Sequence, residues 1–337
     1  MEGKGKGPFY EEKRERNKKT YFRKQLRRVW SGVKTAKTAA STGSPKGMGS
    51  QRRINITGWL FILVPVLAIS LFYFYPMIQA LILSFKSGRG MNLDFVGFDN
   101  YIRLFQDSNF ITAVKNTFIY LIIQVPVMLV LAIFIAVLLN DDNLKFKGFF
   151  RTAIFLPTVT SLVAYSVVFK YMFGGDGIVN KMLMNFHLIS EPIQWISDPF
   201  WAKVTIIIAI TWRFTGYNMI FYLSSLQNID KSVYEAARID GANAFTQFFK
   251  ITIPLLKPMI LFTTITSTIG TLQLFDEVVN ITKGGPGNST MSISQYIYNL
   301  SFEYTPDFGY AATVSYSIVV MVIILTLIQN KIGGDKK

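Results

Sequence analysis

Long apolar runs dominate this sequence and constrain its fold more than any other feature. A helix needs about 20 apolar residues to cross the hydrocarbon core of a bilayer. Six segments meet or approach this length: 59–85, 116–139, 149–173, 204–226, 253–275 and 310–328. Only 16% of the 337 residues are charged, whereas soluble domains carry about a quarter. The sequence therefore predicts an all-α membrane protein with six transmembrane helices.

Basic residues gather before the first apolar run. Residues 1–58 hold 16 Lys and Arg against four Glu, so most of the net charge of +15 lies in this tail. The tail is polar and has no sustained apolar face, which is typical of a disordered segment. It lacks the apolar stretch and cleavage site of a secretory signal, so we expect it to stay in the cytoplasm. Adhesion to anionic membrane lipid accounts for its charge without a nucleic-acid partner.

Charge also predicts the orientation of the six-helix domain over 59–337. Six crossings from a cytoplasmic tail place both termini inside, and the C-terminal end NKIGGDKK is again basic. Lys145, Lys147 and Arg151 lie in the second loop, which suits the cytoplasmic side. The fourth loop, 228–254, then lies inside as well. Three longer loops face outward: 86–115, 174–203 and 276–309.

The fourth loop contains a helix signal followed by a bend. Ser232 and Glu235 have the S-x-x-E spacing of a capping box, which predicts Ser232 as the N-cap. Ala236 and Ala237 favour helix, and their small side chains allow another backbone to approach closely. Gly241 predicts a sharp bend, because glycine adopts left-handed backbone geometry at little cost.

Aromatic residues follow the bend. Phe245, Phe248 and Phe249 recur at helical spacing, and Pro254 stands where the next membrane helix would begin. The loop therefore reads as helix, bend, aromatic helix and re-entry into the membrane. These residues alone leave two interpretations open. The short helix either caps the bundle or inserts into a groove of a cytoplasmic partner.

The loop resembles the EAA motif of permease subunits in binding-protein-dependent ABC importers, whose pattern is E-A-A, three residues, G, nine residues and I-x-L-P. The matching residues are Glu235, Ala236, Ala237, Gly241, Ile251 and Pro254. Ile253 stands where the pattern has Leu, which is a conservative difference. The sequences DGA at 240–242 and GGP at 284–286 resemble the carbohydrate branch, especially the maltose and multiple-sugar permeases.

This resemblance implies the type I, maltose-permease-like fold with a cytoplasmic coupling helix. The six matching residues would couple the chain to a separate ATPase. Partners would be a second permease subunit, two ATP-binding cassette subunits and an extracytoplasmic solute-binding protein, in a bacterial plasma membrane. ATP and Mg would bind to the partner ATPase subunits, and this chain would bind no cofactor.

Signatures of an enzyme are scarce in the sequence. No stretch fits G-x-x-x-x-G-K-[ST], so a nucleotide site of the P-loop type is not expected in this chain. The chain has no cysteine, and His187 is its single histidine, so cysteine nucleophiles, clusters of imidazole ligands and Ser-His-Asp triads are excluded. We therefore expect a transport subunit without a catalytic or metal site. An intramembrane enzyme is disfavoured on these grounds.

Polar residues in the fourth and fifth apolar segments indicate the substrate path. Charged and polar groups are costly at membrane depth, so they face a cavity or a partner, and we expect Arg213 to do so. Aromatic faces and amide groups suit the binding of sugars. The residues expected on the path are Trp212, Tyr217, Asn218, Gln273 and Asp276. Polar residues also bridge membrane helices, and the sequence alone leaves both roles open.

The resemblance places family sugar contacts in the same two segments. Tyr217 matches a sugar-contacting tyrosine and Gln273 an amide position, whereas Arg213, Phe214 and Leu272 differ from the contact residues of the maltose permease. The sequence therefore predicts the membrane subunit of an ATP-driven importer for a sugar or oligosaccharide. The alternatives are the same machinery with glycerol phosphate or a polyamine as cargo, and a secondary carrier that works without ATP.

Overall fold

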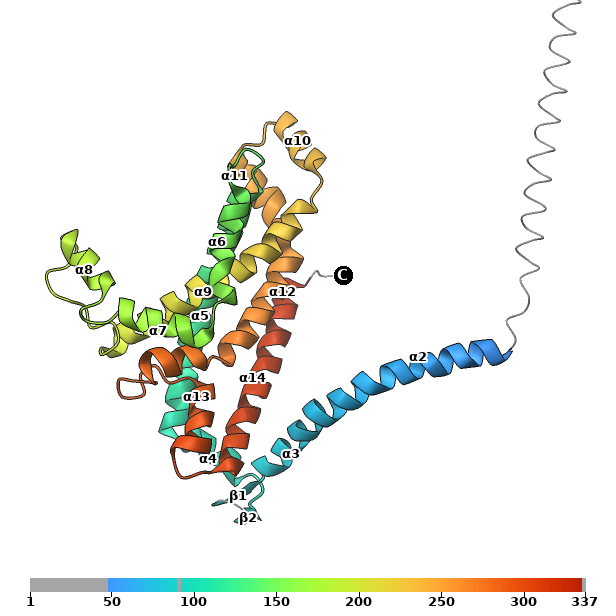
Figure 1. Ribbon diagram of the computed structural model, residues 1–337, viewed down its shortest axis with the longest axis vertical. Helices are drawn as coiled ribbons and strands as arrows, with labels where there is room; N and C mark the ends of the chain where they lie inside the picture. Colours follow the sequence, from blue (N-terminus) through green and yellow to red (C-terminus); the bar gives the residue numbers. More distant parts are fainter. Residues whose placement is uncertain (1–47, 90–91, 335–337) are drawn as a thin grey trace, which may run out of the picture. The chain divides into compact units, whose positions relative to one another are not determined.

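The computed structural model of this chain describes residues 48–89 and 92–334 (Figure 1). Most of the predicted basic tail, residues 1–47, lies outside the described residues. The chain divides into two compact units between Pro76 and Met77, and each is described by itself.

The described part of the first unit is helical. α2 (Met48–Ile69) continues into a π-helical turn, η1 (Ser70–Phe74). Together with α3 (Tyr75–Ser84) it gives a candidate membrane span, Thr57–Ser84, close to the expected 59–85. The helix begins at Met48, so it extends into the end of the predicted tail. Adding residues to an existing helix costs little, which lets it continue beyond its apolar part.

Helices long and apolar enough to cross a membrane account for most of the described chain. Five such runs occur among the described residues, and a bent pair of helices makes a sixth if the pair is one span. The runs are Thr57–Ser84, Ser108–Asn140, Pro199–Gln227, Ala244–Leu272 and Phe308–Gly333. The expectation of a helical membrane protein with six apolar segments is confirmed.

The third segment differs from its expected form. Hydropathy predicts one crossing over 149–173, but the chain forms α6 (Lys147–Val159) and α7 (Leu162–Met172), which meet at 98°. Thr160 is extended between them, and its hydroxyl donates a 2.7 Å hydrogen bond to the carbonyl of Pro157. Pro157 lacks the N–H that would bond to the preceding turn, which weakens the helix just before the break.

The second unit is a helical bundle. α5 (Ser108–Asn140) and α9 (Pro199–Gln227) pack against each other, with α12 (Ile253–Leu272) and α14 (Phe308–Gly333) beside them (Figure 1). Gly216 on α9 permits close packing against α6, because a Cβ there would lie 2.0 Å from the carbonyl oxygen of Ile154.

Shorter elements cover the two ends of this bundle. α10 (Lys231–Ile239) and α11 (Ala244–Gln247) lie at one end, and η2 (Phe248–Thr252) joins α11 to α12. At the opposite end lie a hairpin, α4 and α13 (Figure 1). Their bounds are β1 (Lys86–Arg89), β2 (Asn92–Phe95), α4 (Asp99–Gln106) and α13 (Ile293–Tyr298). Loop 228–254 is therefore at the other end of the bundle from loops 86–115 and 276–309, as the charge pattern predicts.

The remaining elements lie in the longer loops. α8 (Ile178–Asn185) lies in loop 174–203, and η3 (Val278–Thr282) and η4 (Asn299–Glu303) lie in loop 276–309. The hairpin pairs antiparallel, with Lys86 opposite Phe95. It is the only β-structure among the described residues, and the all-α expectation is confirmed, with this short hairpin as an addition to it.

Candidate functional site

The helix of the fourth loop is capped two residues before the expected position. Asp230 is the N-cap of α10, and its carboxylate accepts a 2.9 Å hydrogen bond from the N–H of Ser232. The prediction of Ser232 as N-cap is therefore wrong. Asp caps a helix as well as Ser does, and its earlier position leaves Ser232 and Glu235 inside the helix.

The bend after α10 is formed at Gly241, as expected. Gly241 has a φ of +81°, in the left-handed region. Its N–H bonds to the carbonyl of Arg238 at 3.0 Å, and the N–H of Ala242 bonds to the carbonyl of Ala237 at 2.9 Å. These two bonds form the Schellman motif, which satisfies the last carbonyls of a helix and reverses the chain.

The aromatic helix after the bend runs directly into the next span. Asn243 caps it by accepting a 2.8 Å hydrogen bond from the N–H of Thr246. α11, η2 and α12 then follow without a break, and the π-helical turn η2 ends directly before Ile253. Pro254 lies in the first turn of α12, as predicted. A π-turn adjusts the backbone near a proline that cannot donate a hydrogen bond.

Two contacts tie α10 to the rest of this end of the bundle. The hydroxyls of Tyr234 and Thr252 lie 3.1 Å apart. The ammonium of Lys231 pairs with the carboxylate of Asp142, in the turn between α5 and α6. The hydrogen bond and charge of Lys231 lower the pKa of Asp142. α10 is thus fixed to its own chain through a few side chains.

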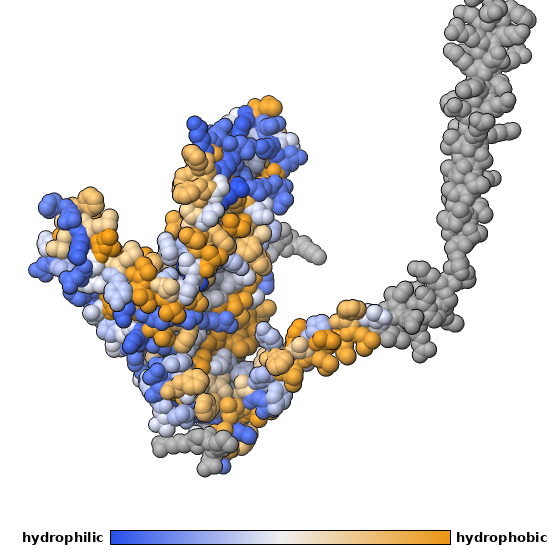
Figure 2. Space-filling view, in the orientation of Figure 1, coloured by the Kyte–Doolittle hydropathy of each residue, from blue (hydrophilic) through white to orange (hydrophobic). Residues whose placement is uncertain are grey.

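Most of the surface of α10 is left uncovered. No residue of this helix is buried, and Ile239 is 87% exposed. Phe245 and Phe249, whose ring centroids are 4.5 Å apart, are exposed next to it. Figure 2 shows hydrophilic side chains gathered over α10, with apolar side chains over the helices that follow. Of the six residues matching the motif, Ala237 and Ile251 are half-buried, and Glu235, Ala236, Gly241 and Pro254 are exposed.

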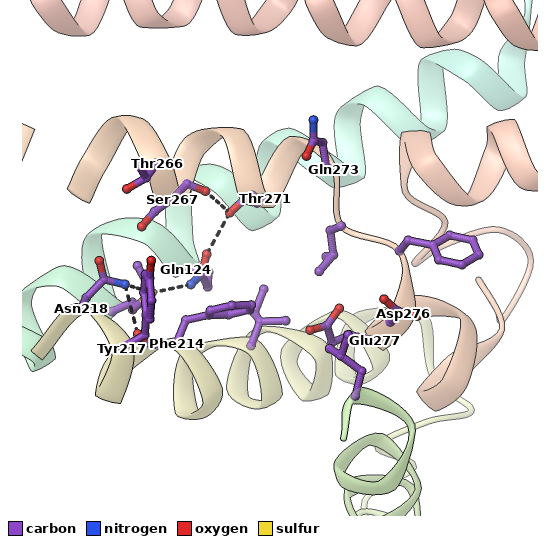
Figure 3. Close-up of a pocket in the computed structure, with 16 residues that line it drawn as sticks. Gln124, Phe214, Tyr217, Asn218, Thr266, Ser267, Thr271, Gln273, Asp276 and Glu277 are labelled. Atoms are coloured by element: carbon purple, nitrogen blue, oxygen red, sulfur yellow. Dashed lines mark hydrogen bonds between the residues drawn. The ribbon is translucent and has the colours of Figure 1, made fainter. Parts of the chain in front are cut away.

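A second candidate site is a cavity among α5, α9 and α12 (Figure 3). Its volume is about 420 Å³, within the range of small-molecule sites. Four of the five residues expected on a substrate path line it: Tyr217, Asn218, Gln273 and Asp276. Other polar lining residues are Gln124, Thr266, Ser267, Thr271 and Glu277.

Trp212 is the expected path residue that lies elsewhere. Its ring centroid is 5.3 Å from that of Phe169 on α7, and it lines a separate apolar groove. Successive helical residues are rotated by about 100°. Trp212 and Tyr217 therefore project from different sides of α9, although both lie in one polar stretch of sequence.

The end of α12 differs from the expected fifth segment. The helix stops at Leu272, and Gln273 is its C-cap, so Gln273 and Asp276 lie beyond the helix and not within it. Gln273 is exposed, and in Figure 3 its side chain points away from Gln124 and Thr271. Asp276 and Glu277 stand at the far end of the cavity from Asn218.

Sequence reasoning missed the contribution of α5 to the cavity. The hydroxyl of Thr271 donates to the side-chain oxygen of Gln124 at 3.2 Å, and the amide of Gln124 also contacts the sulfur of Met128 at 3.1 Å. An amide inside the apolar run YLIIQVPVM is a usable signal, because burying it requires a polar partner. Thr266 gives no such signal, because a threonine in a membrane helix needs no partner on another helix. Its hydroxyl can bond to a carbonyl of its own helix, as it does here.

Comparisons with known proteins agree on one family. Residues 106–334 match the family described as Binding-protein-dependent transport system inner membrane component. The lactose transport system permease protein LacF of Rhizobium radiobacter is 56% identical over 289 residues, which cover 85% of this chain and 97% of that protein. The arabinooligosaccharides transport system permease protein AraP of Bacillus subtilis (strain 168) is 33% identical over 286 residues, covering 83% and 89%.

A solved structure shares the fold. The crystal structure of a bacterial ABC transporter involved in the import of the acidic polysaccharide alginate contains a chain that matches with a TM-score of 0.75 at 23% identity. The match covers 85% of this chain and 98% of that one.

Proposed function

Because this chain belongs to the family of binding-protein-dependent transport system inner membrane components, we propose that it forms the path by which a sugar or oligosaccharide crosses the bacterial plasma membrane. The family match confirms the resemblance given by the loop motif, and the shared fold confirms the expected permease architecture. Members of this family are transport subunits that work with a binding protein. That the cargo is a sugar or oligosaccharide is the part that we propose.

The cavity of about 420 Å³ is the observation that carries the proposal. Tyr217 is 42% exposed on its wall, which leaves an aromatic face free for the C–H surface of a sugar ring. Gln124, Ser267 and Asp276 add amide, hydroxyl and carboxylate groups that suit the hydroxyls on the rim of the ring. LacF, more than half identical to this chain, is named for lactose, and AraP for arabinooligosaccharides.

We further propose that α10 couples this path to ATP hydrolysis on separate subunits. The uncovered apolar side chains of Ile239 and Val233 suit insertion into a groove of a partner. Glu235, Ala236, Ala237, Gly241, Ile251 and Pro254 would shape and position the helix. ATP and Mg would bind to two ATP-binding cassette subunits, and a second permease subunit would complete the path.

The orientation follows from the same proposal. The end of the bundle that carries α10 would be cytoplasmic, together with both termini, and the opposite end with α4 and α13 would meet the solute-binding protein. The basic tail, which lies outside the described residues, would rest on anionic lipid.

Reconstitution tests this function. We expect proteoliposomes holding this chain with its partner permease, ATPase subunits and solute-binding protein to take up a labelled disaccharide only when ATP is supplied. Liposomes holding this chain alone should show no uptake. Uptake by the chain alone would instead identify a secondary carrier, and uptake of glycerol phosphate or a polyamine in place of the sugar would reject the proposed cargo.

A further inference from the structure

Glu277 is a buried carboxylate on the wall of the cavity. Glu277 is 3% exposed and lines the cavity next to Asp276. It follows the loop that leaves α12. One carboxylate oxygen, Oε1, has no hydrogen-bond partner among the described residues. In Figure 3 the carboxylate points toward the side of the cavity where Phe214 lies. An unpaired buried acceptor is costly, so a group that binds it is favoured.

The nearest cation to consider is Arg213, and it does not line the cavity. Arg213 is 7% exposed, as expected for a charge facing the bundle. Its guanidinium donates 3.4 Å hydrogen bonds to the carbonyls of Thr158 and Thr160, at the end of α6. It also lies 4.7 Å from the centroid of the Tyr165 ring. The carbonyl end of a helix attracts a positive charge, so the end of α6 holds two nitrogens of this guanidinium, and only its Nε has no hydrogen-bond partner among the described residues.

The cavity wall is therefore acidic. Asp276 and Glu277 line it, and no Lys or Arg occurs among its described lining residues. Burial raises the pKa of Glu277, whereas Tyr165 and Arg213 favour the ionised form. Charges in a cavity with apolar walls act more strongly than in water. A second negative charge entering this space would be repelled, and a hydroxyl would find an acceptor.

We propose that Glu277 selects cargo by charge: its carboxylate accepts hydrogen bonds from uncharged polyhydroxyl molecules and excludes anionic sugars from the cavity. This inference rests on the proposed function, because it assigns the cargo class of the same path. The fold does not decide the matter, since a transporter with this fold is named for an acidic polysaccharide. We therefore assign the selection of cargo to side chains of the cavity wall and not to the fold.

The charge of the cavity wall can be measured from the rates at which a single thiol in the cavity reacts with charged reagents. The chain has no cysteine, so Ser267→Cys places one reactive group on the wall. The assembled complex is treated at pH 8 with one of two small methanethiosulfonate reagents, one bearing an ammonium and one a sulfonate. The rate of labelling by each reagent is measured from the mass of the chain. Adding Glu277→Gln should lower the ratio of the cationic rate to the anionic rate about three- to tenfold. The matched change Glu303→Gln, at an exposed residue outside the cavity, should leave this ratio unchanged.

A second measurement leaves Glu277 intact, in case Glu277→Gln prevents assembly. In a Ser267→Cys, Asp276→Asn chain, the same ratio should fall as the pH is lowered from 8, because Glu277, whose pKa is raised by burial, gains a proton. The thiolate fraction affects both reagents equally and cancels in the ratio. A ratio that is constant with pH, or one that Glu277→Gln leaves unchanged, overturns the inference.

Protection by sugar separates this inference from the proposed function. An uncharged disaccharide should slow labelling of Ser267→Cys, and Glu277→Ala should raise the half-protecting concentration about tenfold or more. Absence of protection in the chain with Glu277, together with absence of uptake, refutes the sugar path itself. If the disaccharide protects the chain equally well before and after Glu277→Ala, and the ratio of labelling rates is also unchanged, only the role of Glu277 is refuted.

Discussion

The carboxylate of Asp107 accepts a 2.7 Å hydrogen bond from the hydroxyl of Tyr310, which lies 203 positions later in the chain. It also accepts a hydrogen bond from the hydroxyl of Tyr296, and its other oxygen caps α5 through the N–H groups of Asn109 and Phe110. Burial alone would raise the pKa of Asp107, but these hydrogen bonds hold it below its ordinary value. One carboxylate thus joins the start of α5 to α13 and α14.

Replacing this carboxylate should weaken the bundle and change its response to acid. We expect Asp107→Asn to lower the free energy of unfolding by about 1–2 kcal/mol at pH 7, a modest value because the group is partly exposed. A carboxyl with a lowered pKa contributes its full stability above the unfolded-state pKa. That contribution is lost as the pH falls through the folded-state pKa. Thermal unfolding in detergent between pH 3 and pH 7 measures both effects.

The control for Asp107 is Asp99→Asn. Asp99 is an exposed residue in the first turn of α4, and its replacement should change stability little at any pH. Identical pH profiles for the Asp107→Asn chain and the unaltered chain would contradict the role assigned to this carboxylate.

Gly216 should tolerate no side chain. Gly216→Ala would place a Cβ 2.0 Å from the carbonyl oxygen of Ile154, so α9 and α6 would have to separate. We expect a loss of about 1–3 kcal/mol or more in the free energy of unfolding. Gly270→Ala on α12 is the matched change, since no atom lies within 4 Å of its added Cβ. Equal melting temperatures for the two variants would show that this contact is not close in the folded protein.

Hydropathy predicted the membrane helices well because burial in lipid demands long apolar runs whatever the tertiary structure. The break between α6 and α7 was not predicted, because apolar residues flank the short stretch 158–161 and a window average crosses it unchanged. The end of α12 at Leu272 was missed for a similar reason. Leu274 and Phe275 continue the apolar pattern after the chain has left the helix.

Loop 228–254 was predictable in its bend and not in its cap. Gly241 signals a left-handed position whatever surrounds it, whereas Asp230 and Ser232 are both good caps and local sequence does not rank them. The cavity was only partly predictable. Tyr217 and Asn218 stand out in an apolar span, but assigning Trp212 to another side of α9 requires the helix packing.

Gly241 should be sensitive to side chains that resist left-handed geometry. Its φ is +81°, and a residue with a Cβ pays roughly 1–2 kcal/mol there. We expect Gly241→Val to reduce sugar-stimulated ATPase activity and uptake at least tenfold in the reconstituted complex. Gly241→Asn should retain more activity, because Asn tolerates this geometry.

The control for the bend is Gly148→Ala. Gly148 lies in the first turn of α6, and an added Cβ there meets no atom within 4 Å. Its replacement should leave coupling intact. Normal ATPase stimulation in the Gly241→Val complex would remove this glycine from the coupling mechanism.

Tyr217 should contribute to the binding of sugar, whereas Trp212 should not. With Ser267→Cys as the reporter, Tyr217→Ala is expected to raise the half-protecting concentration of a disaccharide about five- to thirtyfold. Trp212→Ala alters a separate groove and should shift this concentration by less than about twofold on the same scale. Equal shifts for the two variants would contradict the assignment of the path to this cavity.

A crosslink from α10 tests the central claim most directly. Ala236→Cys places the sole thiol of the chain on an exposed face of this helix, and a thiol-linked photoreactive probe there reports its neighbour in intact cells. When the crosslink is formed instead in inside-out membrane vesicles, whose cytoplasmic face is accessible, we predict a product with a nucleotide-hydrolysing subunit and a yield that changes when ATP is added. Ser108→Cys, at the opposite end of the bundle, should give no such product. Crosslinks from Ala236→Cys only to lipid or to the extracytoplasmic binding protein would contradict the account.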